Sequence, residues 1–456
     1  MAGIGFELKK LLKDETWFGL AKTYAYAGII SSGPWVLSIV GIMLVGVISL
    51  GHRDASDEVA SFLVSVTYLM SLSLILSSIL QLVFTRFIAD KLYLEQRNIV
   101  LPNLVGALAM TTVGSGAIGL ILAVLFFRAD WIYALLMMMN LVLLCNMWIV
   151  LVFVAGMKRY HAVLFAFLGG YIAIVIFAIP LHYWGANGLL LAFLLGHVLL
   201  TFGLIYLILQ EFDSDELMRL DFLQRKLIHP ILIPIGVFFN LGVWIDKWIF
   251  WFYPDTSDTV NGILRASVIY DMPIFLAYLS IIPGMASFLL RVETDFVERY
   301  QAYYQAINGG RTLGDIEVLR AEMIAAIQRA FLEIIKVQGV TLLVFFLLAD
   351  GIIKWLSLSP LYVHLYYVDL LATAVQVLFL ATLNVMFYFN LLKLALGMTF
   401  WLFLLNTVLT LLSLWLGPPF YGYGFVLALL LTTVGGMFTL SGKLNRLEYL
   451  TFMMQR

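Results

Sequence analysis

Four charged residues interrupt two neighbouring apolar stretches in the middle of the chain. Asp246 and Lys247 lie within the run 228–253, and Arg265 and Asp271 lie within the run that follows it. Charged side chains at membrane depth are costly, and they usually face a bundle interior or a water-filled cavity. There they bind ions, carry protons or contact a polar substrate. These residues therefore predict either a charged wall beside a translocation path or a static ion pair between helices.

The spacing of the four charges suggests how they pair. Asp246 and Lys247 are adjacent, so on a helix they point about 100° apart, and we expect that they do not neutralise each other well. Arg265 and Asp271 are the nearest partners in the sequence. Arg265 is close enough to the end of its run to snorkel toward the membrane interface, whereas Asp271 lies deeper.

A second set of polar residues lies in a later apolar stretch. Asp369, Gln376 and Asn384 are spaced by seven and eight residues, so they share one face of a helix. Such a stripe is poorly placed against lipid, and it predicts either cavity lining or hydrogen bonds to a neighbouring helix. Asn240 is a weaker candidate. If a proton or cation drives transport, we expect its carboxylate among those at membrane depth: Asp246, Asp271 and Asp369.

Long apolar helices must hold these residues in place. The chain has 456 residues, 62% hydrophobic and 12% charged, and a soluble domain of this length could not cover so much apolar surface. A helix of about 20 apolar residues crosses a bilayer, which predicts twelve spans. They lie near residues 24–50, 59–85, 101–127, 131–156, 162–180, 186–209, 228–253, 263–290, 331–349, 361–390, 394–416 and 421–441.

Charge in the loops predicts the orientation. Most of the 27 Lys and Arg residues fall on one side of these spans, and cytoplasmic loops retain such residues, so both termini are expected inside. The sequence thus predicts an all-α integral membrane protein with about twelve transmembrane helices in two six-helix lobes.

The predicted domains follow from the same pattern. Residues 1–23 form an amphipathic interfacial helix, or alternatively a basic flank of the first span. Residues 24–213 form the first lobe, and residues 214–456 form the second. The second lobe carries a cytoplasmic helical loop at about 291–330, which either docks a partner or joins neighbouring spans.

Several kinds of chemistry find no support in the sequence. Cys145 is the one cysteine, which excludes a disulfide framework, and the six histidines show no metal-ligand spacing. No phosphate-binding loop is present, so we expect no direct use of ATP. We predict no cofactor, no metal, no nucleic-acid partner and no enzymatic activity.

Two N-terminal stretches carry a resemblance to a known family. AGIGFELKKLL at 2–12 and AYAGIISSGPWVLSI at 25–39 resemble the PelG family, the inner-membrane component of Pel exopolysaccharide export. Members look like transporters of the multidrug/oligosaccharidyl-lipid/polysaccharide flippase superfamily. The resemblance implies two lobes around a central cavity that opens alternately inward and outward.

The resemblance also implies a substrate and partners. The substrate is a growing polymer rich in N-acetylated amino sugars, and the partners are a cytoplasmic glycosyltransferase and a membrane receptor for cyclic di-GMP. We therefore expect a transporter of biofilm polysaccharide in the cytoplasmic membrane of a Gram-negative bacterium. The alternatives are a scaffold of the synthase complex, a lipid-linked oligosaccharide flippase, a small-molecule exporter or a membrane glycosyl polymerase.

Overall fold

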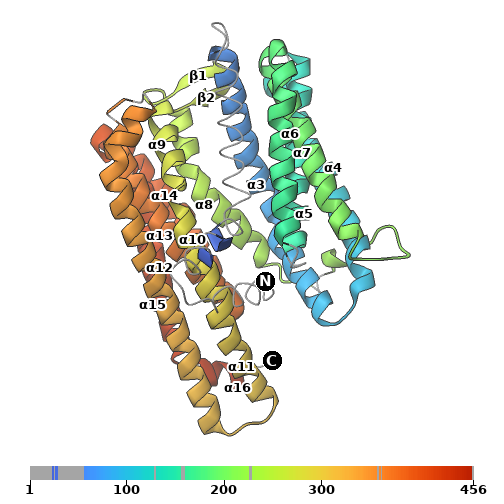
Figure 1. The fold of residues 1–456 in the computed structure, drawn as a ribbon, viewed down its shortest axis with the longest axis vertical. Helices are drawn as coiled ribbons and strands as arrows, with labels where there is room; N and C mark the ends of the chain where they lie inside the picture. Colours follow the sequence, from blue (N-terminus) through green and yellow to red (C-terminus); the bar gives the residue numbers. More distant parts are fainter. Residues whose placement is uncertain are drawn as a thin grey trace. The chain divides into compact units, whose positions relative to one another are not determined.

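The computed structural model describes residues 23–24, 26–28, 56–127, 130–155, 160–224, 228–356, 359–360 and 362–453. Within these ranges the chain is nearly all helical, apart from one short β-hairpin (Figure 1). The predicted interfacial helix at 1–23 and the predicted first span at 24–50 lie almost wholly outside the described residues.

The chain forms two compact units. The N-terminal unit comprises Gly33–Trp244 with Phe250–Ser267, and the C-terminal unit comprises Ile245–Ile249 and Val268–Arg456 together with Met1–Ser32. Helix α8 (Leu232–Phe252) contributes residues to both units. The predicted lobe boundary at residues 213 and 214 stays a prediction.

The N-terminal unit is a bundle of long helices, of which α5, α6 and α7 lie side by side in Figure 1. Its elements are α3 (Ser56–Tyr93), η1 (Arg97–Ile99), α4 (Val100–Phe126), α5 (Trp131–Ala155), α6 (Tyr160–Leu181), η2 (His182–Trp184), α7 (Gly185–Leu209) and η3 (Asp221–Leu223). Small residues let α6 and α7 approach closely. A Cβ on Gly196 would lie only 2.2 Å from Ile174 Cγ1.

The β-hairpin follows α8 and belongs to the N-terminal unit. Strands β1 (Asp258–Asn261) and β2 (Leu264–Ala266) pair antiparallel, and Gly262 turns between them with a φ of 57°. The predicted span near 263–290 therefore starts too early, because the helical stretch that could cross a membrane begins at Val268. Strand β2 buries Leu264 and Ala266, so these two apolar side chains extend the apolar run without being helical.

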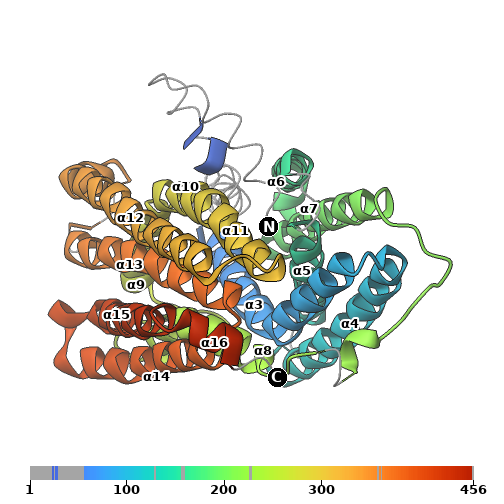
Figure 2. The same ribbon diagram turned by 90° about the horizontal axis from the view of Figure 1, so that it is seen from below.

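The C-terminal unit is built around α13. Its elements are α9 (Val268–Tyr278), α10 (Ile281–Leu290), the π-helical η4 (Arg291–Phe296), α11 (Val297–Asn308), α12 (Leu313–Trp355), α13 (Tyr362–Tyr388), α14 (Leu392–Leu416), η5 (Pro418–Phe420), α15 (Tyr423–Leu444) and α16 (Leu447–Met453). In Figure 2, α13 lies between α12 and α15. Seventeen of its 27 residues are buried, which makes it the core helix of this unit.

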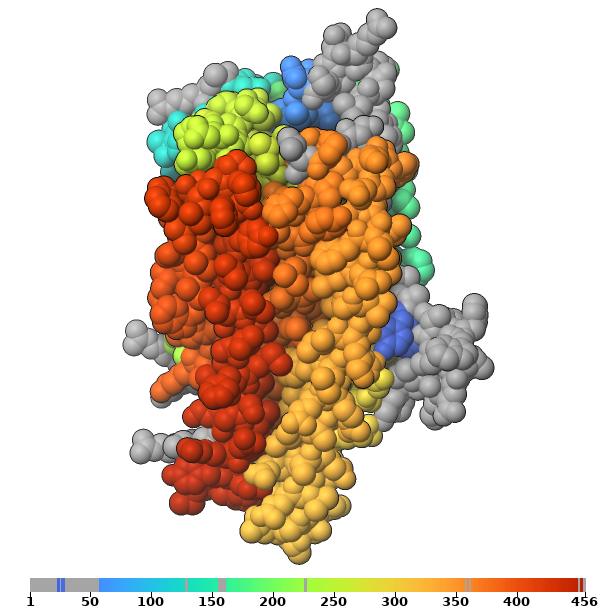
Figure 3. Space-filling view, turned by 90° about the vertical axis from the view of Figure 1, so that its left-hand side faces the viewer, coloured from blue at the N-terminus to red at the C-terminus, as the bar shows by residue number. Residues whose placement is uncertain are grey.

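A helical hairpin extends from the C-terminal unit. Helix α11 turns at Gly310, with a φ of 65°, into the 43-residue α12, and the Thr312 side chain accepts a hydrogen bond from the Asp315 backbone N–H at the start of α12. Arg320 on α12 pairs with Glu448 on α16 at 3.0 Å. Figure 3 shows the end of this hairpin beside the red C-terminal segment. Its cytoplasmic location stays a prediction.

Ten helical stretches among the described residues are long and apolar enough to cross a membrane. One of them, His161–Leu209, contains both α6 and α7. The protein is therefore a multi-pass membrane protein. The count of twelve spans and the orientation of the termini stay predictions.

Candidate functional site

Asp246 and Lys247 form a buried ion pair. Both lie on the turn of α8 that belongs to the C-terminal unit, they are 0% and 1% exposed, and Lys247 Nζ lies 3.0 Å from Asp246 Oδ2. The expectation that these neighbours do not neutralise each other is wrong. Their Cβ atoms diverge by about 100°, but the long, flexible lysine stem allows its ammonium to bend back to the preceding carboxylate.

Two further helices complete the hydrogen bonds of Asp246. The Tyr270 hydroxyl on α9 donates to Oδ2 at 2.6 Å, and Asn406 Nδ2 on α14 donates to Oδ1 at 3.3 Å. Thr410 in turn donates to Asn406 Oδ1 at 2.9 Å. A buried ion pair is tolerated only when such contacts offset the loss of water. The network thus ties α8, α9 and α14 together at one carboxylate.

Aromatic rings surround the ammonium of Lys247. Its Nζ lies 4.6 Å from the centroid of the Phe425 ring on α15 and 5.6 Å from that of Tyr278 on α9. Both distances fall within the range of cation–π attraction, which is strongest in desolvated sites. These rings partly replace the water that Lys247 has lost.

Asp369 on α13 is a second buried carboxyl beside this pair. It is 0% exposed, and neither of its oxygens has a hydrogen-bond partner among the described residues. Lys247 and Asp246 both act on it electrostatically. Because two carboxyls share one ammonium, an ionised Asp369 would leave one negative charge unbalanced. We call Asp246, Lys247, Tyr270, Asp369 and Asn406 the charged cluster.

A third buried carboxyl group lies near the other end of α13. Glu293 in the π-helix η4 is 2% exposed, and the Tyr388 hydroxyl donates to its Oε2 at 2.9 Å. Asn384 lies beside the same carboxyl. Single π-helical turns are rare and frequently mark functional sites. The polar face of α13 therefore carries its own carboxyl group, Asp369, toward one end and lies beside that of Glu293 toward the other.

The other predicted site residues have separate surroundings. Gln376 is 4% exposed, and its Oε1 has no partner among the described residues. Asp271 is half-buried in the first turn of α9, where the helix dipole favours an acidic residue. Arg265 donates to Ser257 within the hairpin segment. Asn240 Nδ2 donates to the Gly236 carbonyl of its own helix at 3.1 Å.

Several residues of these networks were not identified from the sequence. They are Tyr270, Tyr278, Asn406, Thr410, Phe425, Glu293 and Tyr388. Asn406 gives the clearest missed signal, because it is a carboxamide within the apolar run 394–416. The aromatic residues give none, since the chain has 22 Tyr and 34 Phe, too many for any one of them to stand out.

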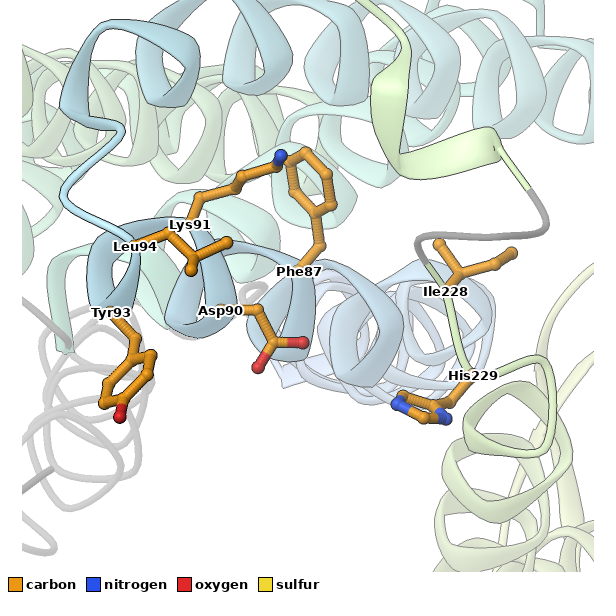
Figure 4. A pocket seen from close by; sticks show the side chains of 7 residues that line it. All are labelled: Phe87, Asp90, Lys91, Tyr93, Leu94, Ile228 and His229. Carbon is orange, nitrogen blue, oxygen red and sulfur yellow. The ribbon is translucent and has the colours of Figure 1, made fainter. Parts of the chain in front are cut away.

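A surface pocket of about 370 Å³ lies in the N-terminal unit at the end of α3 (Figure 4). Its lining residues are Phe87, Asp90, Lys91, Tyr93, Leu94, Ile228 and His229. Lys91 Nζ lies 5.7 Å from the Phe87 ring centroid, and Asp90 pairs with Arg86 at 3.1 Å. The charge of Asp90 is thus already balanced by Arg86. Among the described residues no group of His, Cys, Asp and Glu could hold a metal ion.

Comparison with known proteins gives one family and one fold. The family model described as "PelG: Putative exopolysaccharide Exporter (EPS-E)" matches residues 1–452. A search of curated proteins finds no matching relative.

Several of the solved structures that match are described as MATE or MOP superfamily transporters. An outward-facing multidrug resistance MATE family transporter is 14% identical, with a TM-score of 0.64, and the match covers 92% of this chain and 96% of that one. A MOP superfamily transporter from Pyrococcus furiosus, described as having a binding pocket of reversed polarity, is 14% identical with a TM-score of 0.66 over 94% and 96%. An inward-facing MATE transporter is 12% identical with a TM-score of 0.62 over 92% and 99%. At these identities the likeness shows the fold alone.

Proposed function

Because the chain belongs to the PelG family, we propose that it exports a growing amino-sugar polysaccharide of the Pel type across the cytoplasmic membrane of a Gram-negative bacterium. The polymer comes from a cytoplasmic glycosyltransferase and serves the biofilm matrix. The observation that carries the proposal is the family match over nearly the whole chain, joined to the fold of MOP superfamily transporters. The protein acts as a transporter rather than as an enzyme.

The buried charges fit a polymer without diphosphate. A lipid-linked diphosphate needs an excess of cationic groups to hold its phosphates. In the charged cluster one ammonium faces two carboxyls. The cluster thus offers no cationic excess for a pyrophosphate-linked lipid, and the Pel-type polymer stays the proposed substrate.

The charged cluster supplies a means of coupling. It joins α8, α9 and α14 through Asp246, and the buried carboxyl of Asp369 lies beside it on α13. An ionised, unpaired carboxylate in a dry interior costs several kcal/mol, so a proton or a small cation on Asp369 changes how these helices pack. We propose that uptake and release of this charge bias the C-terminal unit between two arrangements.

The partners are the glycosyltransferase and a membrane receptor for cyclic di-GMP. The α11–α12 hairpin is the proposed contact, because α11 and the first turns of α12 lie beyond the apolar part of α12. Several of its residues are exposed, among them Leu313 and Val318. The N-terminal segment 1–23 is the second proposed contact.

Polymer translocation into sealed vesicles tests the proposal. The protein is reconstituted with the cognate glycosyltransferase outside, nucleotide sugar is supplied, and polymer protected from an added glycosidase is measured. We expect protected polymer with the wild-type protein and a loss with the double variant Asp246→Asn/Lys247→Met, which removes the buried pair. The matched control is Arg86→Gln/Asp90→Asn, which removes an exposed pair on α3 and should leave protection unchanged.

Other outcomes separate the alternatives. Normal synthesis and a stable complex without protected polymer would favour a scaffold. Protection of a lipid-linked precursor rather than of free polymer would favour a flippase. Polymer formed by this chain without the glycosyltransferase would make it a polymerase.

A further inference from the structure

A second pocket, of about 340 Å³, lies in the N-terminal unit where α3, α5 and α7 begin. Its polar and aromatic lining is Asp57, Glu58, Ser61, Asp130, Tyr133, Trp184, Asn187 and Asn261. None of these residues belongs to the charged cluster or to the pocket at the other end of α3. Its volume lies at the small end of the range of ligand sites, which suits one or two sugar rings. We call it the acidic pocket.

The acidic pocket combines hydrogen-bond acceptors with an exposed ring. Asn187 Nδ2 donates to Asp130 Oδ2 at 3.3 Å, while Asn187 Oδ1 is buried with no partner among the described residues. Trp184 is 68% exposed at the rim. Ionised carboxylates and amide oxygens accept hydrogen bonds, and an indole ring offers a flat face to an apolar sugar face or to a cation. This chemistry recognises sugars through their hydroxyl and amine groups.

Helix starts hold two of the carboxylates in place. Asp130 Oδ1 accepts a hydrogen bond from the Tyr133 backbone N–H at 3.0 Å, which caps the start of α5. Glu58 lies against the start of α7, where a Cβ on Gly185 would be 2.6 Å from its carboxyl carbon. The positive end of the helix dipole favours a carboxylate there. Acceptors mounted on rigid helix ends form a preorganised site.

We propose that the acidic pocket binds sugar units of the exported polymer on the outer side of the membrane. The inference rests on the proposed function, and the outer location follows from the positive-inside orientation. Three carboxylates and no lining Lys or Arg make the pocket selective. Hexosamines with a free amine bind most tightly, N-acetylated hexosamines bind less tightly, and uronates are repelled.

A purely structural role for these lining residues makes the opposite prediction. Exposed tryptophans anchor helices at the membrane interface, and acidic residues cap helix starts without binding any ligand. If these two roles account for the residues, the pocket binds no saccharide, and charge on the sugar has no effect.

Binding to the purified full-length protein in lipid nanodiscs distinguishes the two explanations. The probes are a β-1,4-linked glucosamine tetramer, its fully N-acetylated counterpart and an oligouronate of the same length, measured by isothermal calorimetry. We expect affinity to fall in that order, with no measurable heat for the uronate. The glucosamine affinity should also fall with added salt, because the contact is ionic.

Matched variants locate the site. Trp184→Ala and Asp57→Asn should each weaken glucosamine binding about tenfold, the usual cost of losing a stacking ring or a charged hydrogen bond. The controls are Trp131→Ala and Asp258→Asn. Trp131 is 70% exposed, both residues lie at the same end of the unit, and neither lines the pocket. They should bind as the wild type does.

The outcomes separate this inference from the proposed function. Absence of glucosamine binding, or equal affinity in the pocket and control variants, overturns the inference, whatever the transport assay shows. If the vesicle assay shows protected polymer but the acidic pocket binds no glucosamine tetramer, only the inference fails. If the pocket variants lose binding while the wild type protects no polymer, the saccharide site stands and the transport function fails.

Discussion

Lys247 provides the sharpest test at the residue scale. Lys247→Met removes the ammonium that balances Asp246 and leaves its carboxylate buried and uncompensated. Loss of one partner of a buried pair costs about 3–5 kcal/mol. We expect a clear fall in the melting temperature of the detergent-solubilised protein. Fluorescence-detected size-exclusion chromatography after heating measures that temperature.

The double variant provides the control for that measurement. Asp246→Asn/Lys247→Met removes both charges, and replacement of a whole buried pair is often neutral or stabilising. Its melting temperature should therefore return toward that of the wild type. A double variant as unstable as Lys247→Met would mean that the charge left on Asp246 is not the cause of the loss.

Asp369 carries a prediction of the opposite sign. Asp369→Asn keeps the shape of the side chain and removes a carboxyl whose oxygens have no hydrogen-bond partner among the described residues. Stability should be unchanged or higher. If Asp369 carries the coupling proton, polymer protection in vesicles should no longer respond to a pH gradient. A variant that responds to the gradient as the wild type does would remove Asp369 from the coupling scheme.

The sequence could identify the charged residues of the cluster but not their contacts. Asp246, Lys247 and Asp369 are recognisable because a charge within an apolar run is rare and costly. Tyr270 and Asn406 meet Asp246 across 24 and 160 residues of sequence, so only tertiary packing brings them together. The pairing of Asp246 with Lys247 depends on the lysine rotamer, which residue spacing does not determine.

At the scale of elements, the closeness of α6 and α7 depends on Gly196. A Cβ there would lie 2.2 Å from Ile174 Cγ1 and 2.9 Å from the Gly170 carbonyl oxygen. Gly196→Ala should force these helices apart and destabilise the protein by about 1–3 kcal/mol. Thermal unfolding in detergent measures the loss.

Gly203 on the same helix is the matched control. Its added Cβ would lie 4.0 Å from Ala166 Cβ, an ordinary contact, and alanine favours a helix over glycine. Gly203→Ala should keep or raise the melting temperature. Equal losses in the two variants would show that steric contact between α6 and α7 is not responsible.

Helix positions were predictable where a turn lies at each end of an apolar run. The predicted span at 131–156 corresponds to α5, and that at 394–416 corresponds to α14. The run 263–290 was misleading because β2 buries apolar side chains as a span does. Hydropathy measures burial rather than backbone conformation, so it could not separate a buried hairpin from the start of a helix.

For the whole molecule, the matching family model is described as a putative exopolysaccharide exporter, and the solved structures share the fold. The charge features fall into two classes. The charged cluster is buried in the C-terminal unit, whereas the acidic pocket opens at the surface of the N-terminal unit. The first suits coupling, because it is closed to a bulky polymer. The second suits contact with sugars, because its acceptors are accessible.

Orientation in the membrane is the prediction on which the outer location of the acidic pocket depends. Cys145 is the one cysteine of the chain and is buried, so Cys145→Ala gives a background for labelling. Thr259→Cys in the hairpin and Glu317→Cys in α12 introduce exposed thiols. Most Lys and Arg residues lie on the predicted side of the membrane that holds Glu317, which is therefore expected to be cytoplasmic. A membrane-impermeant maleimide added to intact spheroplasts should label Thr259→Cys and leave Glu317→Cys unlabelled. Permeabilisation should then expose Glu317→Cys. The reverse pattern would place the acidic pocket inside, where it would meet the polymer at entry rather than at exit.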